Sequence, residues 1–243
     1  MAQNKRAGKK SLAQNDFLAP LTPINVSATD VGTNRSFNDG AATVSFSLPA
    51  NSPAATSYTV TATAVGLSTR TASDASSPLT VTGLNSDVTY EISVTATNAS
   101  GTSAAGTTTV YVTTVPATPT NLTASAQAGT NYDTVSWTAP ANGGKAISQY
   151  TWTSSDGKSG TTTATSVSVL QEAGTAQTYQ VYATNANGNS VVTAASNSVT
   201  SYYNYNNFYN FYNFYNFYNF YNFYNYSNFY NYYFAAFSFY WFR

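Results

Sequence analysis

The chain has 243 residues, no His and no Cys, and only 7% of it is charged, with 9 Lys and Arg balancing 9 Asp and Glu. Without His and Cys, the sequence excludes Ser-His-Asp and Cys-His nucleophiles, the usual zinc and haem ligands, and disulfides. Carboxylate pairs and oxygen-only metal sites remain chemically open, but the few acids are scattered. We therefore expect no enzyme, no catalytic, cofactor-binding or metal-binding residue, and no cofactor.

Charge also limits the partners of the chain. Its formal net charge is +0, whereas nucleic-acid binding by a whole domain requires a basic face, so we expect no nucleic acid. The aromatic end of the chain is long enough to cross a bilayer, but Asn recurs there at every third position, which is costly in hydrocarbon. We expect no membrane span and no secretion signal, because no apolar run follows the basic start.

Composition divides the chain into four segments. Of its 38 aromatic residues, 26 lie in residues 201–243, so the body and the end of the chain differ strongly. The segments are a basic arm at 1–20, two Thr/Ser/Ala/Val-rich domains at 21–114 and 115–200, and an Asn/Phe/Tyr repeat tail at 201–243.

The basic arm has three interpretations. A solvated terminus is the plainest, nucleic-acid binding is a second, and docking onto an acidic protein surface, with Leu18 and Leu21 among the anchors, is a third. The candidate docking residues are Lys5, Arg6, Lys9, Lys10 and Phe17.

The two middle segments alternate small polar with apolar residues, which predicts β-strands with one buried face. The clearest runs are 43–48, 57–62 and 90–96, and turn residues such as Asn38-Asp39-Gly40 and Asn187-Gly188 separate the runs. Short strands at this spacing predict an all-β chain with two sandwiches of about 90 residues each.

The second sandwich repeats the first. Residues 89–101 match 178–188, and Val44-Ser45-Phe46 matches Val135-Ser136-Trp137, so an aromatic residue occupies the same core position in both. The four residues expected to hold the two cores are Phe46, Tyr90, Trp137 and Tyr179.

These motifs resemble fibronectin type III domains. Pro119-Thr120-Asn121-Leu122 and residues 135–140 look like the opening strands of that family, and residues 84–90 look like its tyrosine corner. The resemblance implies two tandem fibronectin type III or immunoglobulin-like sandwiches, in which the hydroxyl of Tyr90 bonds to nearby backbone and Tyr179 takes the same place. The first domain departs from the family because Phe46 replaces the usual Trp.

Other polar and aromatic residues of the body have structural interpretations. Asp30, Asp39, Asp74 and Asp87 lie in turn-like contexts and are predicted to cap local backbone rather than to bind calcium. Trp152 lies two residues after Tyr150, so both side chains are expected on the same face of a strand, which favours packing of Trp152. A glycan-stacking platform is the alternative.

The tail repeats Phe-Tyr-Asn six times over residues 208–225. A three-fold extended helix would gather Phe, Tyr and Asn into three pure columns, whereas a helix or strand would mix them. A single copy would expose too much aromatic surface, so we expect self-assembly, with a trimer favoured, or docking; the alternative is an unstructured, adhesive tail. The assembly residues are Phe208, Tyr209, Asn210, Phe211, Tyr212, Asn213, Phe214, Tyr215, Phe217, Tyr218, Phe220, Tyr221, Phe223, Tyr224, Phe237, Phe239 and Trp241.

The layout of basic arm, tandem sandwiches and aromatic end resembles structural proteins of tailed bacteriophages. We expect a non-enzymatic virion protein, as a capsid decoration, head fibre or tail fibre component, assembled in the host cytoplasm. Its partners would be itself, other virion proteins and, weakly, host-surface glycans. A bacterial extracellular filament or adhesin is the alternative, and an accessory module of a polysaccharide-acting enzyme is a third.

Overall fold

The computed structural model describes residues 18–202. These residues form strands β1 to β17 and, within this range, no helix, so the predicted all-β class is confirmed. The predicted assembly residues of the tail and the predicted docking residues of the arm, from Lys5 to Phe17, lie outside the described residues.

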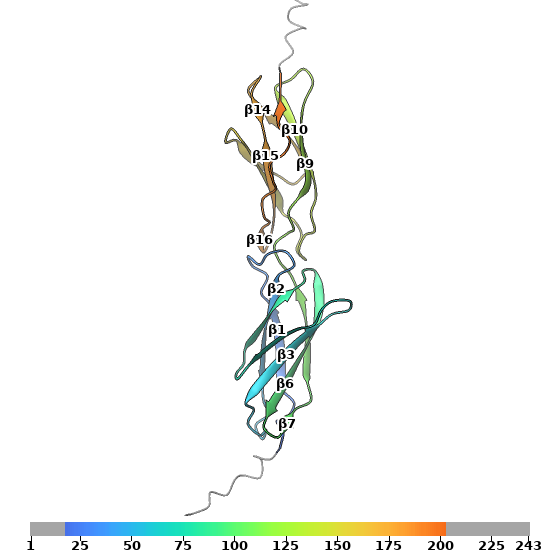
Figure 1. Ribbon diagram of the computed structural model, residues 1–243, viewed down its shortest axis with the longest axis vertical. Helices are drawn as coiled ribbons and strands as arrows, with labels where there is room; N and C mark the ends of the chain where they lie inside the picture. Colours follow the sequence, from blue (N-terminus) through green and yellow to red (C-terminus); the bar gives the residue numbers. More distant parts are fainter. Residues whose placement is uncertain (1–17, 203–243) are drawn as a thin grey trace, which may run out of the picture. The chain divides into compact units, whose positions relative to one another are not determined.

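The first sandwich contains two antiparallel sheets (Figure 1). Its inner faces alternate with outer ones along each strand, as the period-2 pattern predicts. One sheet has the order β1 (Ile24–Asp30), β2 (Gly40–Ser47), β5 (Leu79–Leu84); the other has β4 (Arg70–Asp74), β3 (Ser57–Thr63), β6 (Val88–Asn98), β7 (Gly101–Thr102), with β8 (Gly106–Val112) on β6.

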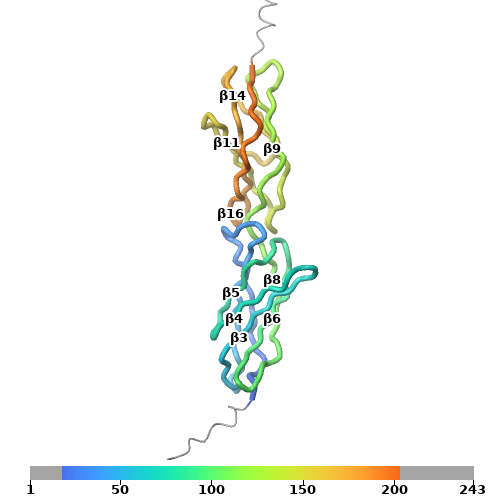
Figure 2. The backbone as a smooth tube through the Cα atoms, viewed as in Figure 1, coloured from blue at the N-terminus to red at the C-terminus, as the bar shows by residue number. Residues whose placement is uncertain are grey.

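The core of this sandwich lies between the two sheets. Val44 and Ile92, one from each sheet, are 0% exposed. Phe46 of β2 packs on Tyr58 of β3 with ring centroids 4.8 Å apart and ring planes tilted by 52°, within the centroid spacing that aromatic pairs favour. The antiparallel registers place β3 between β4 and β6, and Figure 2 labels all three strands.

The second sandwich follows the same plan. Trp137 packs on Tyr150 with centroids 5.4 Å apart at 61°, which repeats the Phe46–Tyr58 pair of the first. Its strands are β9 (Thr120–Ala126), β10 (Tyr132–Thr138), β11 (Gln149–Ser154), β12 (Ser159–Thr162), β13 (Ser166–Leu170), β14 (Ala176–Gln177), β15 (Tyr179–Asn185), β16 (Gly188–Asn189) and β17 (Val199–Thr200). They form the sheets β13-β10-β9, β12-β11-β15-β16 and β14-β17.

The tyrosine corner is present in the first sandwich. Tyr90 is 1% exposed, and its hydroxyl accepts a hydrogen bond of 2.9 Å from the backbone N–H of Asn85. This is the bond that the fibronectin resemblance implies for residues 84–90. Tyr179, at the matching position, is 0% exposed.

By compactness, the chain divides into two units that interleave along the sequence. Within the described residues, the first contains 18–123 together with Val135–Val167 and Thr178–Asn197, and the second contains Ala124–Thr134, Ser168–Gln177 and 198–202. The predicted domain boundaries, at 21–114 and 115–200, stay predictions.

Candidate functional site

The outer edge of the second sandwich is formed by residues 190–197, here called the edge segment. It runs beside β15 but is not a regular strand. Ser190, Thr193 and Ser196 are buried, and the residues between them are exposed. A β-strand would show a burial period of two, so this segment does not continue the sheet as a regular strand; three of its residues advance for every two of β15.

Side-chain hydroxyls complete the pairing of this segment. Along β15, each facing residue donates its N–H to a hydroxyl of the edge segment and accepts an N–H from the same edge residue. The bonds to hydroxyl oxygen run from Ala183 to Ser190, Val181 to Thr193 and Tyr179 to Ser196, each 3.0 Å long. The backbone bonds in the other direction are 2.8, 2.9 and 2.8 Å long.

The serine hydroxyls of this edge are satisfied in both directions. The hydroxyl of Ser190 also donates to the carbonyl of Val191 at 2.9 Å, and that of Ser196 donates to the carbonyl of Asn197 at 2.8 Å. Since an unpaired buried N–H is costly, these hydroxyls let β15 keep its backbone donors bonded next to a chain that is not a strand.

The exposed residues of the edge segment are small and apolar. Val191 is 70% exposed and Val192 is 45% exposed, and Ala194 and Ala195 follow at the same spacing and are also exposed. Because the period is three, these four residues form two outward columns, 191/194 and 192/195. No charged side chain interrupts either column.

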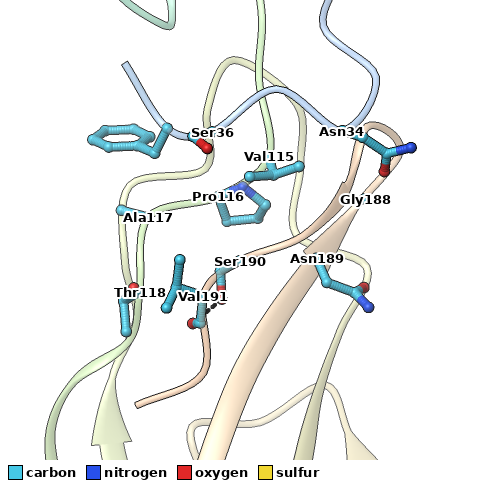
Figure 3. A pocket seen from close by; sticks show the side chains of 11 residues that line it. Asn34, Ser36, Val115, Pro116, Ala117, Thr118, Gly188, Asn189, Ser190 and Val191 are labelled. Atoms are coloured by element: carbon cyan, nitrogen blue, oxygen red, sulfur yellow. Dashed lines mark hydrogen bonds between the residues drawn. The ribbon is translucent and has the colours of Figure 1, made fainter. Parts of the chain in front are cut away.

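A pocket of about 450 Å³ lies at the start of the edge segment (Figure 3). Val115, Pro116 and Ala117 line one side of the pocket, and Val191 lines another. Asn34 and Asn189 contribute side-chain amides to the lining, which other residues complete. Those others are Ser36, Phe37, Thr118, Gly188 and Ser190. The pocket therefore combines apolar side chains with neutral hydrogen-bonding groups and has no charged lining residue.

A buried polar cluster holds the backbone at Thr113 and Thr114 next to this pocket. The amide of Asn185 donates to the carbonyl of Thr114 at 2.8 Å, and the amide of Asn187 donates to the hydroxyl of Thr113 at 2.8 Å. A Cβ on Gly32 would lie 2.6 Å from the Thr113 carbonyl oxygen, so only glycine fits there. The segment that joins the two sandwich sequences is thus fixed by side-chain amides.

Three of the four predicted backbone caps are wrong, and two of these three carboxylates bind residues distant in sequence. Asp30 accepts the backbone N–H of Thr113 at 3.1 Å and also its hydroxyl, so it belongs to this polar cluster rather than to a local turn. Asp87 accepts the hydroxyl of Tyr111, and this bond raises the pKa of Tyr111 above its usual range. Both contacts join residues far apart in sequence, which a reading of local turn residues misses.

The other two acids have local partners, but only Asp74 caps backbone as predicted. Asp39 forms an ion pair of 3.3 Å with Arg35, and Asp74 accepts the N–H of Ala75 at 2.6 Å. Among residues 18–202, no group of three or more acids is placed to hold a metal ion.

Trp152 packs against the sheet. It faces Gly160 across β11 and β12, and a Cβ on Gly160 would lie 2.9 Å from the indole. The indole covers the space that a larger residue at 160 would fill, and Trp152 is half-buried. This favours the packing interpretation over a free aromatic platform.

The predicted core residues occupy the interiors of the sandwiches. Phe46 is 8% exposed and Trp137 is 5% exposed. Leu18 and Leu21, named as anchors beside the arm, are 57% and 46% exposed. In the described range there is no apolar helix long enough to cross a membrane.

The edge segment and the polar cluster were not predicted from the sequence. A signal for the edge was nevertheless present, since Ser190, Thr193 and Ser196 recur every three residues. Asn185 and Asn187 had no such signal, because Asn is common throughout the chain.

Comparisons with known proteins identify relatives of the fold only. No family model and no curated protein matches the chain. A solved structure of the chicken CNTN1 FN1–FN3 domains is 14% identical, with a TM-score of 0.44, covering 76% of this chain and 67% of that one. A two-domain fibronectin type III segment of chicken tenascin is 16% identical, with a TM-score of 0.37, covering 73% and 98%. Titin kinase with its flanking domains is 21% identical, with a TM-score of 0.32, covering 36% and 17%.

Proposed function

We propose that the chain is a non-enzymatic structural subunit of a larger assembly. In this proposal the two sandwiches act as a spacer, and the aromatic tail joins copies of the chain. The spacer role is supported by the succession of two sandwiches along the chain, each with its own buried aromatic pair.

The single observation that carries the proposal is the distribution of aromatic residues. The described sandwiches bury aromatic residues in pairs such as Trp137–Tyr150 and leave few others exposed, such as Tyr111 and Tyr132, whereas residues 201–243 hold 26 aromatics. Soluble single chains do not leave apolar surface of that extent uncovered, so other copies or partners would cover it.

Within this class, we place the chain in a bacteriophage virion, as a capsid decoration or fibre component. The basis is the layout of arm, tandem sandwiches and aromatic end. Either the arm, including Lys5 and Arg6, or the tail would anchor it, and the sandwiches would project for weak adhesion to host glycans. The second candidate is an extracellular filament or adhesin subunit that polymerises through the tail.

Electron microscopy of the purified full-length protein tests this proposal. We expect discrete particles with closed symmetry, three-fold being favoured by the three columns of the repeat. Open-ended filaments would favour the second candidate, because a repeated contact that does not close propagates. Single, unassociated molecules at micromolar concentration would contradict both.

A further inference from the structure

We propose that the pocket lined by Asn34, Phe37, Thr118 and Asn189 binds one sugar residue of a neutral glycan. This inference rests on the proposed function, in which the sandwiches adhere weakly to glycans, and it names the site and the class of sugar. Figure 3 shows Asn34 and Asn189 at one end of the pocket and Ala117 and Thr118 at the other. All of the lining residues belong to the first compact unit, so the pocket is formed within one unit.

The first argument is the set of polar groups that the fold leaves for a ligand. Within residues 18–202, no hydrogen bond engages the side chains of Asn34, Ser36 or Thr118. Asn189 accepts the hydroxyl of Thr184 at 2.8 Å through its carbonyl oxygen, and its NH2 group stays open. Amide side chains and hydroxyls both donate and accept hydrogen bonds. The hydroxyls of a sugar do the same, so the two sets of groups are complementary.

The second argument is that the pocket is already formed. The N–H of Asn34 donates to the carbonyl of Asn187 at 2.7 Å, and the N–H of Val115 donates to the carbonyl of Arg35 at 3.1 Å. A Cβ on Gly188 would lie 2.8 Å from Oδ1 of Asn34, so glycine at this position leaves room for the amide. A site ordered before binding loses less conformational entropy when the ligand arrives.

The third argument is the apolar part of the lining. Pro116 and Val191 contribute aliphatic surface, and the half-buried Phe37 contributes a ring. The C–H groups of a pyranose ring form apolar faces that can cover such surface. The volume of about 450 Å³ lies within the range of about 300–1,000 Å³ for small-molecule sites, which combine apolar walls with a few polar groups.

The fourth argument is the absence of charge, which selects neutral sugars. No Lys, Arg, Asp or Glu lines the pocket, and Arg35, beside it in sequence, forms an ion pair of 3.3 Å with Asp39. A uronic acid or another anionic sugar would lose hydration here without gaining a counter-charge, which is costly.

A single sugar contacts few groups, so each pocket binds weakly. Copies joined through the tail would present several pockets to one glycan-covered surface, and linked sites reach an avidity far above the affinity of one site. The weak pocket and the assembling tail therefore serve the same adhesive function.

Saturation-transfer NMR of the full-length chain tests the class of ligand. The probes are the methyl glycosides of glucose, galactose, mannose, N-acetylglucosamine, fucose and rhamnose, with methyl glucuronide as the charged comparison. We expect transfer to at least one neutral glycoside and at least fivefold weaker binding of the glucuronide. No transfer to any neutral glycoside at millimolar concentrations, or stronger binding of the glucuronide, would overturn the proposal.

Matched substitutions locate the site. Asn34 has a φ of 57°, which glycine adopts freely, so Asn34→Gly removes the amide and keeps the backbone. Asn121→Gly is the control, because it makes the same change at a φ of 53° outside the pocket lining. We expect Asn34→Gly to weaken binding of the best glycoside at least fivefold and Asn121→Gly to leave it within twofold. Equal affinities of the two variants would overturn the choice of this pocket.

A hydroxyl deletion at the other end of the pocket gives an independent check. Thr118→Val keeps the shape of the side chain and removes the hydroxyl, and Thr107→Val makes the same change on the exposed face of β8. We expect only Thr118→Val to weaken binding, by at least threefold. Sedimentation of the same samples separates this proposal from the assembly it rests on. An assembled chain that binds no glycoside would overturn the pocket alone, and a monomeric chain that binds would overturn tail-mediated assembly alone.

Discussion

The two sandwiches share a core plan but close their second sheets differently. In the first, β8 pairs with β6 by a regular register from Val88↔Val112 to Val94↔Gly106. In the second, the edge segment meets β15 through the hydroxyls of Ser190, Thr193 and Ser196. In the first sandwich the outer strand is therefore paired through backbone groups, whereas in the second the outer segment is paired partly through side-chain hydroxyls.

This difference changes what the edge presents to its surroundings. Three residues of the edge segment advance for every two of β15, so two of every three edge residues point away from the sheet. The first sandwich contains one such unit, where Ala96 donates its N–H to the hydroxyl of Ser103 at 3.0 Å, before β8 begins. The edge segment, which pairs through hydroxyls, therefore presents more exposed apolar residues than β8, which pairs through its backbone.

Removing the hydroxyls of the edge gives the largest expected effect. In Ser190→Ala/Thr193→Val/Ser196→Ala, three N–H groups of β15 lose their acceptors, at ~1–3 kcal/mol each for a buried unsatisfied donor. That total is comparable with the stability of a small domain, so we expect the second sandwich to unfold or to lose most of its urea resistance. Trp137 and Trp152 report this transition by fluorescence.

The matched control for that variant is Thr107→Ala/Thr109→Val in β8. Both threonines are exposed and lie on a strand paired through its backbone, so we expect a change within about 0.5 kcal/mol. Equal destabilisation by the two sets of substitutions would show that hydroxyl pairing contributes nothing specific to the second sandwich.

Gly160→Ala tests a further difference between the sandwiches. Val60 faces Ala72 in the first, whereas Trp152 faces Gly160 in the second. The added methyl would lie 2.9 Å from the indole, so the ring must move. We expect a loss of about 1–2 kcal/mol in a urea titration, typical of overpacking. A neutral or stabilising result would mean that the indole does not rest on position 160.

Tyr90→Phe tests the tyrosine corner observed in the first sandwich. The N–H of Asn85 would lose its acceptor, and we expect the first sandwich to lose about 1 kcal/mol, the usual contribution of one hydrogen bond. Amide hydrogen exchange resolved by NMR would separate the two sandwiches. An unchanged exchange rate at Asn85 would count against the corner.

The smallest effect concerns pH. The hydroxyl of Ser154, aided by Lys158, holds the pKa of Asp156 below its usual range. A carboxyl whose pKa is lower in the folded state stabilises the fold above its unfolded pKa of about 3.9, and that stabilisation disappears as pH falls through the folded value. We expect Asp156→Asn to cost under about 1 kcal/mol at pH 7, because the pair is exposed, and progressively less as pH falls through the folded pKa. A cost that does not fall with pH would rule out the carboxylate as its cause.

Much of the fold was predictable because it depends on local alternation. Strands containing Phe46 and Tyr90, and the aromatic position shared by Phe46 and Trp137, follow from period-2 burial and from the internal repeat. The predicted strands at 43–48, 57–62 and 90–96 correspond to β2, β3 and β6.

The remainder depends on contacts between residues distant in sequence. The acceptor role of Asp30 toward Thr113 and the amide bonds of Asn187 join residues 83 and 74 positions apart, and no local pattern encodes them. The hydroxyl pairing of the edge segment was readable as a three-residue spacing. The spacing alone does not show that these hydroxyls accept the N–H groups of β15, because that depends on which strand the segment lies beside.

Sedimentation velocity of the full-length chain beside a version ending at Tyr202 tests the central claim most directly. The shorter version keeps every described strand and loses the Phe-Tyr-Asn repeat. We predict an oligomer for the full-length chain, with a trimer favoured, and a folded monomer for the shorter one. A shorter version that keeps the oligomeric state of the full-length chain would contradict assembly through the aromatic tail.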